Sequence, residues 1–194
     1  MNSPINEDIQ QILKSIEKLL ESKDFIIIAI DGKSGSGKTT LANALSSLCD
    51  SNLFHMDDFF LRPELKTEER MKEIGGNVDY VRFKEEVIDG IYSREKFKYQ
   101  IYDCKEMALT DYISVEPKRI NIIEGSYSMH PTLIENYDYK IFLNLDYDTQ
   151  KERILKRNDP SAYKRFIDEW IPKENIYFNE MKIKEKCDIV IYPK

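Results

Sequence analysis

Hydrophobic residues recur along the chain at helical spacing in some segments and fill other segments without interruption. Residues 6–22 carry apolar side chains at helical spacing, which predicts an amphipathic helix. A continuous apolar run from Phe25 to Ile30 follows, and such a run is typical of a parallel strand that is buried on both faces. Helical spacing returns over residues 41–48, after a segment rich in glycine. The pattern therefore predicts a packing helix, a buried strand, a glycine-rich loop and a second helix.

The same alternation of strand-like and helix-like segments continues along the rest of the chain. Further strands are predicted at residues 51–56, 119–125, 139–145 and 188–192. Helices are predicted at residues 81–93, 148–158 and 161–184, the last interrupted at Pro172, and a small β excursion is predicted at residues 97–116. This order predicts an α/β fold, a doubly wound and mostly parallel sheet of about five strands with helices on both faces.

The length of 194 residues predicts a single domain over residues 1–194. Within it, residues 1–24 are interpreted as an N-terminal packing helix and residues 148–168 as the approximate extent of a small lid. Lys and Arg total 29 and Asp and Glu total 35, so the net charge is −6. An acidic chain lacks the basic face that is typical of nucleic-acid-binding proteins, so we expect no nucleic-acid partner.

The three cysteines, Cys49, Cys104 and Cys187, are widely spaced and form no C-x-x-C motif. This usage favours neither a disulfide framework nor a zinc site and is typical of a reducing cytosol. The N-terminal residues are polar and acidic rather than signal-like. The longest apolar run is far shorter than the roughly 20 residues that span a bilayer. We therefore expect a cytoplasmic protein without a membrane partner.

The glycine-rich segment contains the pattern G-x-x-x-x-G-K-[ST] at Gly32, Gly37, Lys38 and Thr39. Between a strand and a helix, this pattern forms a phosphate-binding loop, because glycines let backbone N–H groups converge on one anion near a helix N-terminus. Lys38 would reach the β- and γ-phosphates of a nucleotide, and the Thr39 hydroxyl would bind Mg²⁺. The alternative is a glycine-rich turn with an exposed lysine. The residues expected to contact the nucleotide are Gly32, Lys33, Ser34, Gly35, Ser36, Gly37, Lys38, Thr39 and Thr40.

Acidic residues follow two of the predicted strands. Asp57 and Asp58 come after one strand, and Glu124 ends another. Ligands of open parallel sheets bind beyond the carboxyl ends of the strands, so Asp57 is interpreted as the catalytic base. Glu124 is interpreted as a second carboxylate near the metal, and Asp58 as a water-mediated Mg²⁺ contact or a turn cap. The alternatives for these acids are a solvated helix start and a strand cap, and His55 is interpreted as a packed strand residue.

Two arginines of the predicted helix over residues 148–158 share one helix face, because Arg153 and Arg157 are four positions apart. Arginines that close over transferring phosphoryl oxygens stabilise the developing charge. We therefore interpret Arg153 and Arg157 as catalytic lid residues. The alternative is a solvated basic face.

With these residues in view, the chain resembles the uridine kinase and nicotinamide riboside kinase family of P-loop kinases over about Phe25 to Tyr192. The segments that carry the resemblance are the phosphate loop, Asp57-Asp58-Phe59-Phe60 with Pro63, Asn77-Val78-Asp79, Tyr102-Asp103 and Ile122-Ile123-Glu124-Gly125. The resemblance implies a P-loop NTPase fold with a small lid, ATP and Mg²⁺ as cofactors, and phosphoryl transfer to a hydroxyl group of a small molecule such as a nucleoside or riboside. The residues that it implies at the acceptor are Asp57, Asp79, Tyr102, Asp103 and Glu124. The resemblance also implies that Asp57 is a Mg²⁺ ligand as well as the base.

The chain also departs from the family pattern. Uridine kinases carry a histidine four residues after the Tyr-Asp aspartate, and that position is Met107 here. Where their lid has a glycine-containing loop, this chain has Pro160 followed by Ser-Ala-Tyr. The acceptor is therefore left open by the sequence. Two other functions remain as alternatives, a non-catalytic ATP-binding module and a GTPase switch, although the N-K-x-D and D-x-x-G motifs of GTPases are missing.

Overall fold

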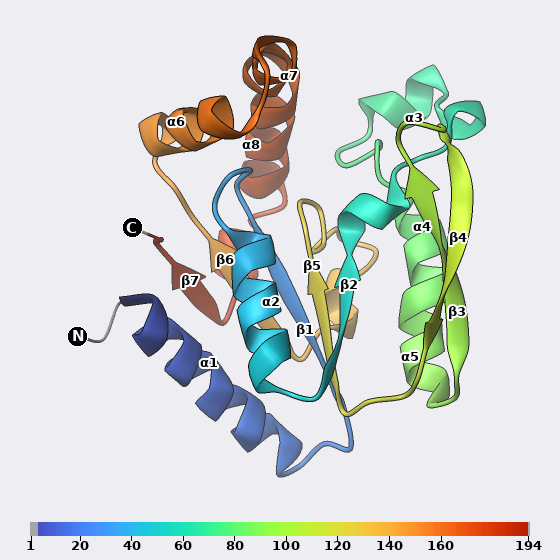
Figure 1. Ribbon diagram of the computed structural model, residues 1–194, viewed down its shortest axis with the longest axis vertical. Coiled ribbons are helices and arrows are strands. Elements are labelled where there is room, and N and C mark those ends of the chain that lie inside the picture. The colour runs from blue at the N-terminus through green and yellow to red at the C-terminus, as the bar shows by residue number, and fades with distance from the viewer. Residues whose placement is uncertain (1–3, 194) are drawn as a thin grey trace.

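A five-stranded parallel sheet forms the centre of the computed structural model, which describes residues 4–193 (Figure 1). Its strands are β1 (Ile26–Gly32), β2 (Ser51–His55), β5 (Ile120–Glu124), β6 (Tyr139–Leu143) and β7 (Ile189–Ile191). They lie in the order β2-β5-β1-β6-β7, so the first strand occupies the middle. The predicted α/β fold and the five predicted strands are confirmed.

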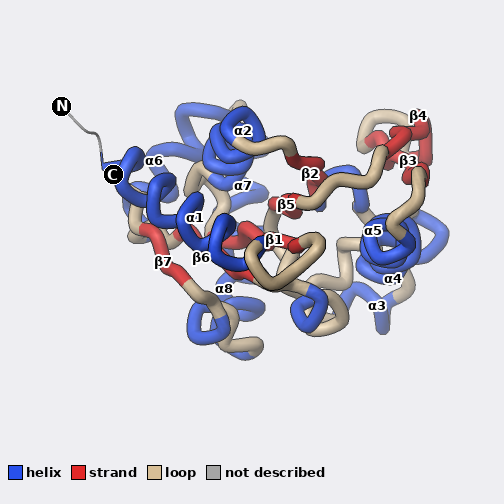
Figure 2. Tube along the Cα trace, turned by 90° about the horizontal axis from the view of Figure 1, so that it is seen from below, coloured by secondary structure: helices blue, strands red, loops and turns tan. Residues whose placement is uncertain are grey.

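Helices cover both faces of this sheet, as predicted. Helices α1 (Pro4–Leu20) and α2 (Lys38–Leu48) pack on one face with alternate residues of β1, including Ile26, Ile28 and Ile30. The opposite face is covered by α4 (Tyr80–Phe83), α5 (Asp89–Ser93) and α8 (Ile171–Glu180). Figure 2 shows α2 and α8 on opposite sides of the strands. Because β1 is covered on both faces, all seven of its residues are buried.

The predicted β excursion is an antiparallel hairpin of β3 (Phe97–Asp103) and β4 (Ala108–Val115). It lies beside α4 and α5, which a π-helical segment at Lys84–Ile88 joins (Figure 1). The short helix α3 (Glu68–Lys72) lies on the other side of α4 and α5 from the hairpin (Figure 2). Together these elements extend the structure beyond the β2 edge of the sheet.

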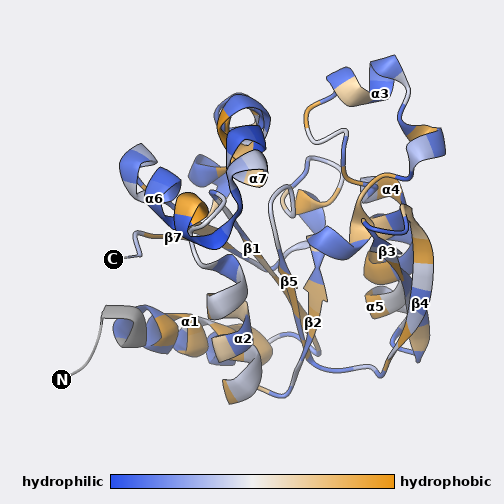
Figure 3. Cartoon of the chain, turned by 45° about the horizontal axis from the view of Figure 1, so that its top comes forward, coloured by the Kyte–Doolittle hydropathy of each residue, from blue (hydrophilic) through white to orange (hydrophobic). Residues whose placement is uncertain are grey.

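The region predicted as a lid consists of α6 (Tyr147–Arg157), α7 (Pro160–Arg165) and a π-helical segment at Phe166–Trp170 that leads into α8. It has a small apolar cluster of its own around Ile154, Phe166 and Ile171. Helix α6 is otherwise predominantly hydrophilic (Figure 3). Pro172 was expected to interrupt the helix at residues 161–184 and to suit the first turn of a helix. It lies in the first turn of α8, where a missing N–H is tolerated, and the π-helical segment precedes it.

No helix among residues 4–193 is long and apolar enough to cross a membrane.

One fully buried carboxylate ends the central strand. The side chain of Asp31 accepts hydrogen bonds from the N–H groups of Gly32 and Met129, at 2.7 and 3.0 Å, and from the Tyr177 hydroxyl at 2.8 Å. Burial nevertheless raises the pKa of Asp31 from 3.8 to about 6, with the Lys38 charge and these hydrogen bonds acting in the opposite direction. The folded protein therefore binds this proton more tightly than the unfolded chain does.

This pKa predicts a specific dependence of stability on pH. The contribution of Asp31 to the free energy of unfolding is present in full below its unfolded-state pKa of 3.8 and is lost as the pH rises through about 6. Between pH 4 and pH 7, wild type should lose about 2 kcal/mol more stability than Asp31→Asn. Urea unfolding of both proteins across this range measures the difference, and parallel pH profiles would contradict the prediction.

Candidate active site

The carboxyl ends of β1, β2 and β5 meet at one edge of the sheet. The phosphate loop follows β1, a 3₁₀ turn at Met56–Phe59 follows β2, and Glu124 ends β5. Glu124 lies level with Ile30 of β1 on one side and with His55 of β2 on the other. The parallel pairing thus brings the predicted loop and the predicted carboxylates together.

The phosphate loop bends through left-handed glycines. Gly35 has a φ of 78° and Gly37, which caps α2, has a φ of 94°, conformations that residues with a Cβ rarely adopt. Gly32 is required for a different reason, because an added Cβ would lie 2.2 Å from the carbonyl oxygen of Leu143 on β6.

The N–H groups of this loop fall into two sets. Those of residues 32, 33, 34 and 36 donate to protein acceptors, namely Asp31 Oδ1, Leu143 O, Glu174 Oε2 and Lys33 O. Among the hydrogen bonds of the described residues, the N–H groups of Gly35 and Gly37 have no protein acceptor. The first N–H groups of α2 have no intrahelical acceptor either. This second set is the one that can bind an anion.

Lys38 extends back over the loop, as the motif predicts. Its Nζ donates to the carbonyl oxygens of Gly32 at 2.8 Å and of Lys33 at 3.2 Å. The side chain of Lys33 points elsewhere, since its Nζ donates to Leu145 O at 2.7 Å. Lys38 is therefore the lysine that supplies positive charge within the loop.

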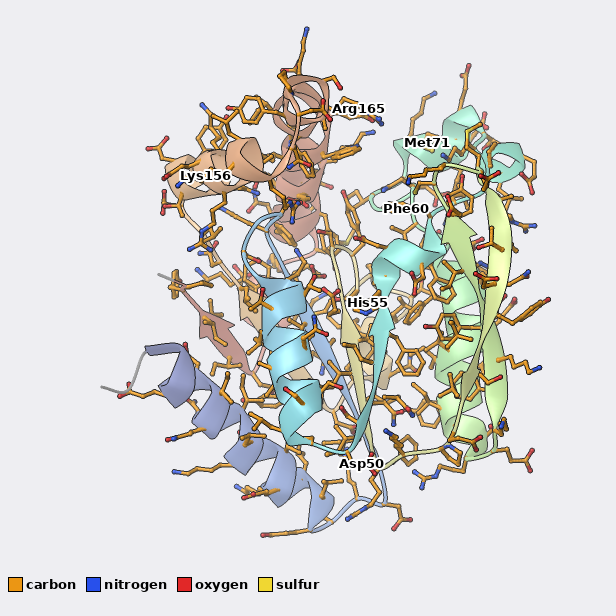
Figure 4. The ribbon with its side chains drawn as sticks, in the orientation of Figure 1. Asp50, His55, Phe60, Met71, Lys156 and Arg165 are labelled. Carbon is orange, nitrogen blue, oxygen red and sulfur yellow. The ribbon has the colours of Figure 1, made fainter. Side chains whose placement is uncertain are left out.

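Glu124 links the loop to β2. Its buried carboxylate accepts a hydrogen bond from the Thr39 hydroxyl at 3.1 Å, and His55 Nδ1 lies 2.6 Å from the same oxygen, Oε1. The hydrogen bond to Glu124 is the largest influence on His55 and raises its pKa. Figure 4 shows His55 at the end of β2. His55 was interpreted as a packed strand residue, and its contact with Glu124 makes it part of the site.

Asp57 and Asp58 leave the same turn in different directions. The Asp57 side chain is exposed, but the surrounding protein excludes enough bulk water to raise its pKa, and the Glu124 carboxylate raises it further. The positive charges that oppose this shift come from three residues, Lys38, His55 and Arg157. Asp58 instead accepts a hydrogen bond from the Tyr99 side chain on the hairpin. Asp57 is thus the acid of this pair that faces the phosphate loop.

The two predicted lid arginines approach the site from α6. Arg153 Nη1 donates to the carbonyl oxygen of Gly35 at 3.4 Å. Arg157 is close enough to lower the pKa of Asp57, and its guanidinium carbon lies 5.9 Å from the centre of the Phe166 ring. Lys156 and Arg165, labelled in Figure 4, lie on the neighbouring surfaces of α6 and α7. The structure therefore brings Arg153 and Arg157 together with the loop and with Asp57.

Two of the acids predicted at the acceptor, Asp79 and Asp103, accept hydrogen bonds from nearby backbone N–H groups. Asp79 is buried and caps α4, because Oδ1 accepts the Arg82 N–H at 3.1 Å. Tyr102 is buried in β3, and Asp103 Oδ1 accepts two N–H groups of the hairpin turn at 2.6 and 3.1 Å. Among the described hydrogen bonds, neither acid contacts Asp57 or Glu124. Their roles at an acceptor remain predictions.

One residue of the site was missed altogether. Glu174 on α8 is buried, and its carboxylate contacts Ser34 of the phosphate loop and Ser126 after β5. A signal for it exists in the sequence, because Ile171, Glu174 and Tyr177 recur at helical spacing and place an acid on a buried face.

The donor set of the site fits Mg²⁺. Thr39, Asp57 and Glu124 offer only oxygen atoms, which Mg²⁺ prefers, and Thr39 and Glu124 are already within 3.1 Å of one another. No group of three or more His, Cys, Asp or Glu side chains within residues 4–193 is arranged to hold a metal by itself. Mg²⁺ at nucleotide sites is held by one or two carboxylates together with phosphates and water, so two carboxylates and a hydroxyl are sufficient.

Known proteins are similar to this chain in sequence and in structure. No protein-family model matches the chain. The chain is 30% identical over 148 residues to the uridine kinase of Ureaplasma parvum serovar 3. This aligned region covers 71% of this chain and 69% of that protein. It is 31% identical over 143 residues to the uridine kinase of Bacillus mycoides, covering 68% and 65%. A solved structure of a possible uridine kinase from Bacillus stearothermophilus has a TM-score of 0.70 at 21% identity, over 95% of this chain and 98% of that chain, and it confirms the fold.

Two glycine substitutions should separate loop conformation from packing. Gly37→Ala introduces no contact within 4 Å but must adopt a left-handed φ, so it should cost about 1–2 kcal/mol of stability and weaken ATP binding at least about tenfold. Gly32→Ala overlaps the β6 backbone and should cost roughly 3 kcal/mol or more. Urea unfolding and ATP titration measure both effects. Wild-type ATP affinity in Gly37→Ala would show that the bend of the loop is not needed.

Proposed function

We propose that this chain transfers the γ-phosphoryl group of ATP to a hydroxyl group of a nucleoside or riboside. The chain belongs to the uridine kinase family. The observation that carries this proposal is the convergence of the phosphate loop, the Thr39–Glu124 pair and Asp57 at one edge of the sheet. The names of the relatives support a nucleoside as the acceptor.

The phosphate loop would hold the triphosphate of ATP. The N–H groups of Gly35, Gly37 and the start of α2 face the anion, and Lys38 exchanges its bonds to loop carbonyls for bonds to the β- and γ-phosphates. Mg²⁺, when held by Thr39 and the carboxylates of Asp57 and Glu124, would neutralise charge on these phosphates. Arg153 already contacts the loop at Gly35, so a small movement of α6 would bring it onto the γ-phosphate.

Asp57 would act as the base. It accepts the proton of the acceptor hydroxyl, whose oxygen forms a bond to the γ-phosphorus while the bond to the β–γ bridging oxygen breaks and ADP leaves. Its raised pKa moves its basicity toward that of a useful proton acceptor, and the nearby cations Lys38 and Arg157 keep the carboxylate ionised. The acceptor would enter between this turn and the hairpin, and Tyr102 and the Asp79 region would form the walls of its site.

A panel assay tests the proposal. Purified protein is incubated with ATP, Mg²⁺ and single nucleosides, ribosides or vitamin alcohols, and ADP release is measured. We expect turnover with at least one nucleoside or riboside and none in Lys38→Ala, which lacks the ammonium of the loop. ATP binding without turnover on any acceptor would favour the non-catalytic alternative, and binding of GTP in preference to ATP would favour the GTPase alternative.

The adjacent acids provide a matched pair for the role of the base. Asp57→Asn should lower kcat by roughly 100- to 10,000-fold, the usual contribution of a general base, while ATP still binds. Asp58→Asn changes a neighbouring carboxylate that bonds to Tyr99, so its kcat should stay within about tenfold of wild type. Equal losses in the two variants, or an unchanged rate in Asp57→Asn, would remove Asp57 from the proposed mechanism.

A further inference from the structure

A buried carboxylate from the C-terminal helix reaches the phosphate loop. The side chain of Glu174 on α8 is almost fully buried, and Oε2 accepts the backbone N–H of Ser34 at 3.1 Å. Oε1 accepts hydrogen bonds from the Ser34 hydroxyl and, at 2.9 Å, from the Ser126 hydroxyl. Figure 1 shows α8 beside the loop that joins β1 to α2. One side chain therefore satisfies three donors that belong to two different loops.

These contacts fix the half of the phosphate loop that does not face the anion. The N–H of Ser34 belongs to the set that donates to protein acceptors, and Glu174 is the only acceptor in that set that comes from a distant helix rather than from β1, β6 or the loop itself, among the described residues. Gly35 follows directly with its left-handed φ of 78°. Holding the Lys33–Ser34 peptide therefore constrains the directions of the N–H groups that follow.

The second loop is tied to the same carboxylate. Ser126 follows Gly125, whose N–H donates to Ile30 O at 3.1 Å on the central strand. Tyr127 has a φ of 68°, an uncommon conformation for an aromatic residue, and it is buried against Tyr177 with ring centres 4.8 Å apart. A constrained backbone of this kind persists only where surrounding contacts determine it. Glu174 is one of those contacts.

We infer that Glu174 is a positioning residue of the nucleotide site, which acts through Ser34 by holding the phosphate loop in its anion-binding shape. This inference rests on the proposed role of the loop in binding ATP. All three partners of Glu174 are neutral donors. The contacts therefore depend on the length of its side chain and on its ability to accept hydrogen bonds, rather than on its negative charge. Helix α8 also continues from the lid through the π-helical segment, so the same contact anchors the lid to the loop.

Three substitutions separate reach from charge. In Glu174→Gln the amide oxygen can accept the Ser34 N–H while the amide NH₂ donates to a serine hydroxyl, so the shape is kept without the charge. Glu174→Asp keeps the charge but is one carbon shorter and withdraws from Ser34. Glu174→Ala removes the acceptor entirely and leaves three donors unpaired. A positioning role thus predicts that Gln resembles wild type and that Asp resembles Ala.

The test is calorimetric titration with ATP and Mg²⁺ in the absence of any acceptor, well below the melting temperature of each variant. We expect the Kd for ATP to rise about tenfold or more in Glu174→Asp and Glu174→Ala and to stay within about threefold of wild type in Glu174→Gln. In turnover assays the KM for ATP should rise in the same order, and the KM for the acceptor should not change. Glu180→Ala, at the exposed end of the same helix, is the matched control with wild-type affinity.

Several results would overturn the inference. Wild-type Kd in Glu174→Asp, a defect in Glu174→Gln without one in Glu174→Asp, or a lower melting temperature without a change in Kd would each do so. If Glu174→Ala does not fold, the comparison of Asp with Gln decides alone. Failure of wild type to bind ATP would overturn the proposed function and this inference together, whereas ATP binding that is equal in wild type and Glu174→Asp would overturn the inference only.

Discussion

Parallel pairing of β5 between β1 and β2 is the constraint on which the site depends. Because the three strands run in the same direction, their carboxyl ends meet, and the phosphate loop, Glu124 and the turn that carries Asp57 meet with them. Side chains alternate between the faces of a sheet, so a slip of one residue in this pairing would turn Glu124 away from Thr39. The positions of the polar groups are therefore set by the burial of isoleucine-rich strands.

Two buried carboxylates shape the phosphate loop by accepting hydrogen bonds from its backbone N–H groups. Asp31 accepts the N–H of Gly32, and Glu174 accepts the N–H of Ser34, each from a buried position. Burial of a carboxylate is unfavourable unless donors compensate it, and each of these side chains accepts hydrogen bonds from three donors. This arrangement pairs the inner N–H groups with protein acceptors and leaves the outer ones available to an anion. Lys38 and the arginines of α6 supply local positive charge in a chain whose net charge is −6.

Local signals in the sequence predict the elements and the centre of the site. The apolar run before Gly32 and the helical spacing after Thr39 are local patterns that span only a few residues each. The predictions of a strand, a loop and a helix made from them are therefore confirmed. The positions of Asp57 and Glu124 follow from one rule about strand ends. Glu174 could not be placed in the same way. Its helical spacing indicates a buried acid, but its partner Ser34 is 140 positions away in the sequence, and no local pattern records that contact. Asp103 could not be interpreted fully from the sequence either. Only the structure shows that its carboxylate accepts hydrogen bonds from two backbone N–H groups of the hairpin turn.

Helix α1 lies outside the catalytic machinery, yet it seals part of the interior. Ile9, Ile12 and Ile16 are buried with residues of β1 and α2. A shortened protein that started at the first strand would lose these isoleucines and expose the apolar residues of β1 and α2 that they cover, and contiguous apolar patches of that kind favour self-association. The smallest version of this enzyme that stays monodisperse in solution should therefore retain its opening amphipathic segment, even though every residue predicted to bind phosphate lies after it.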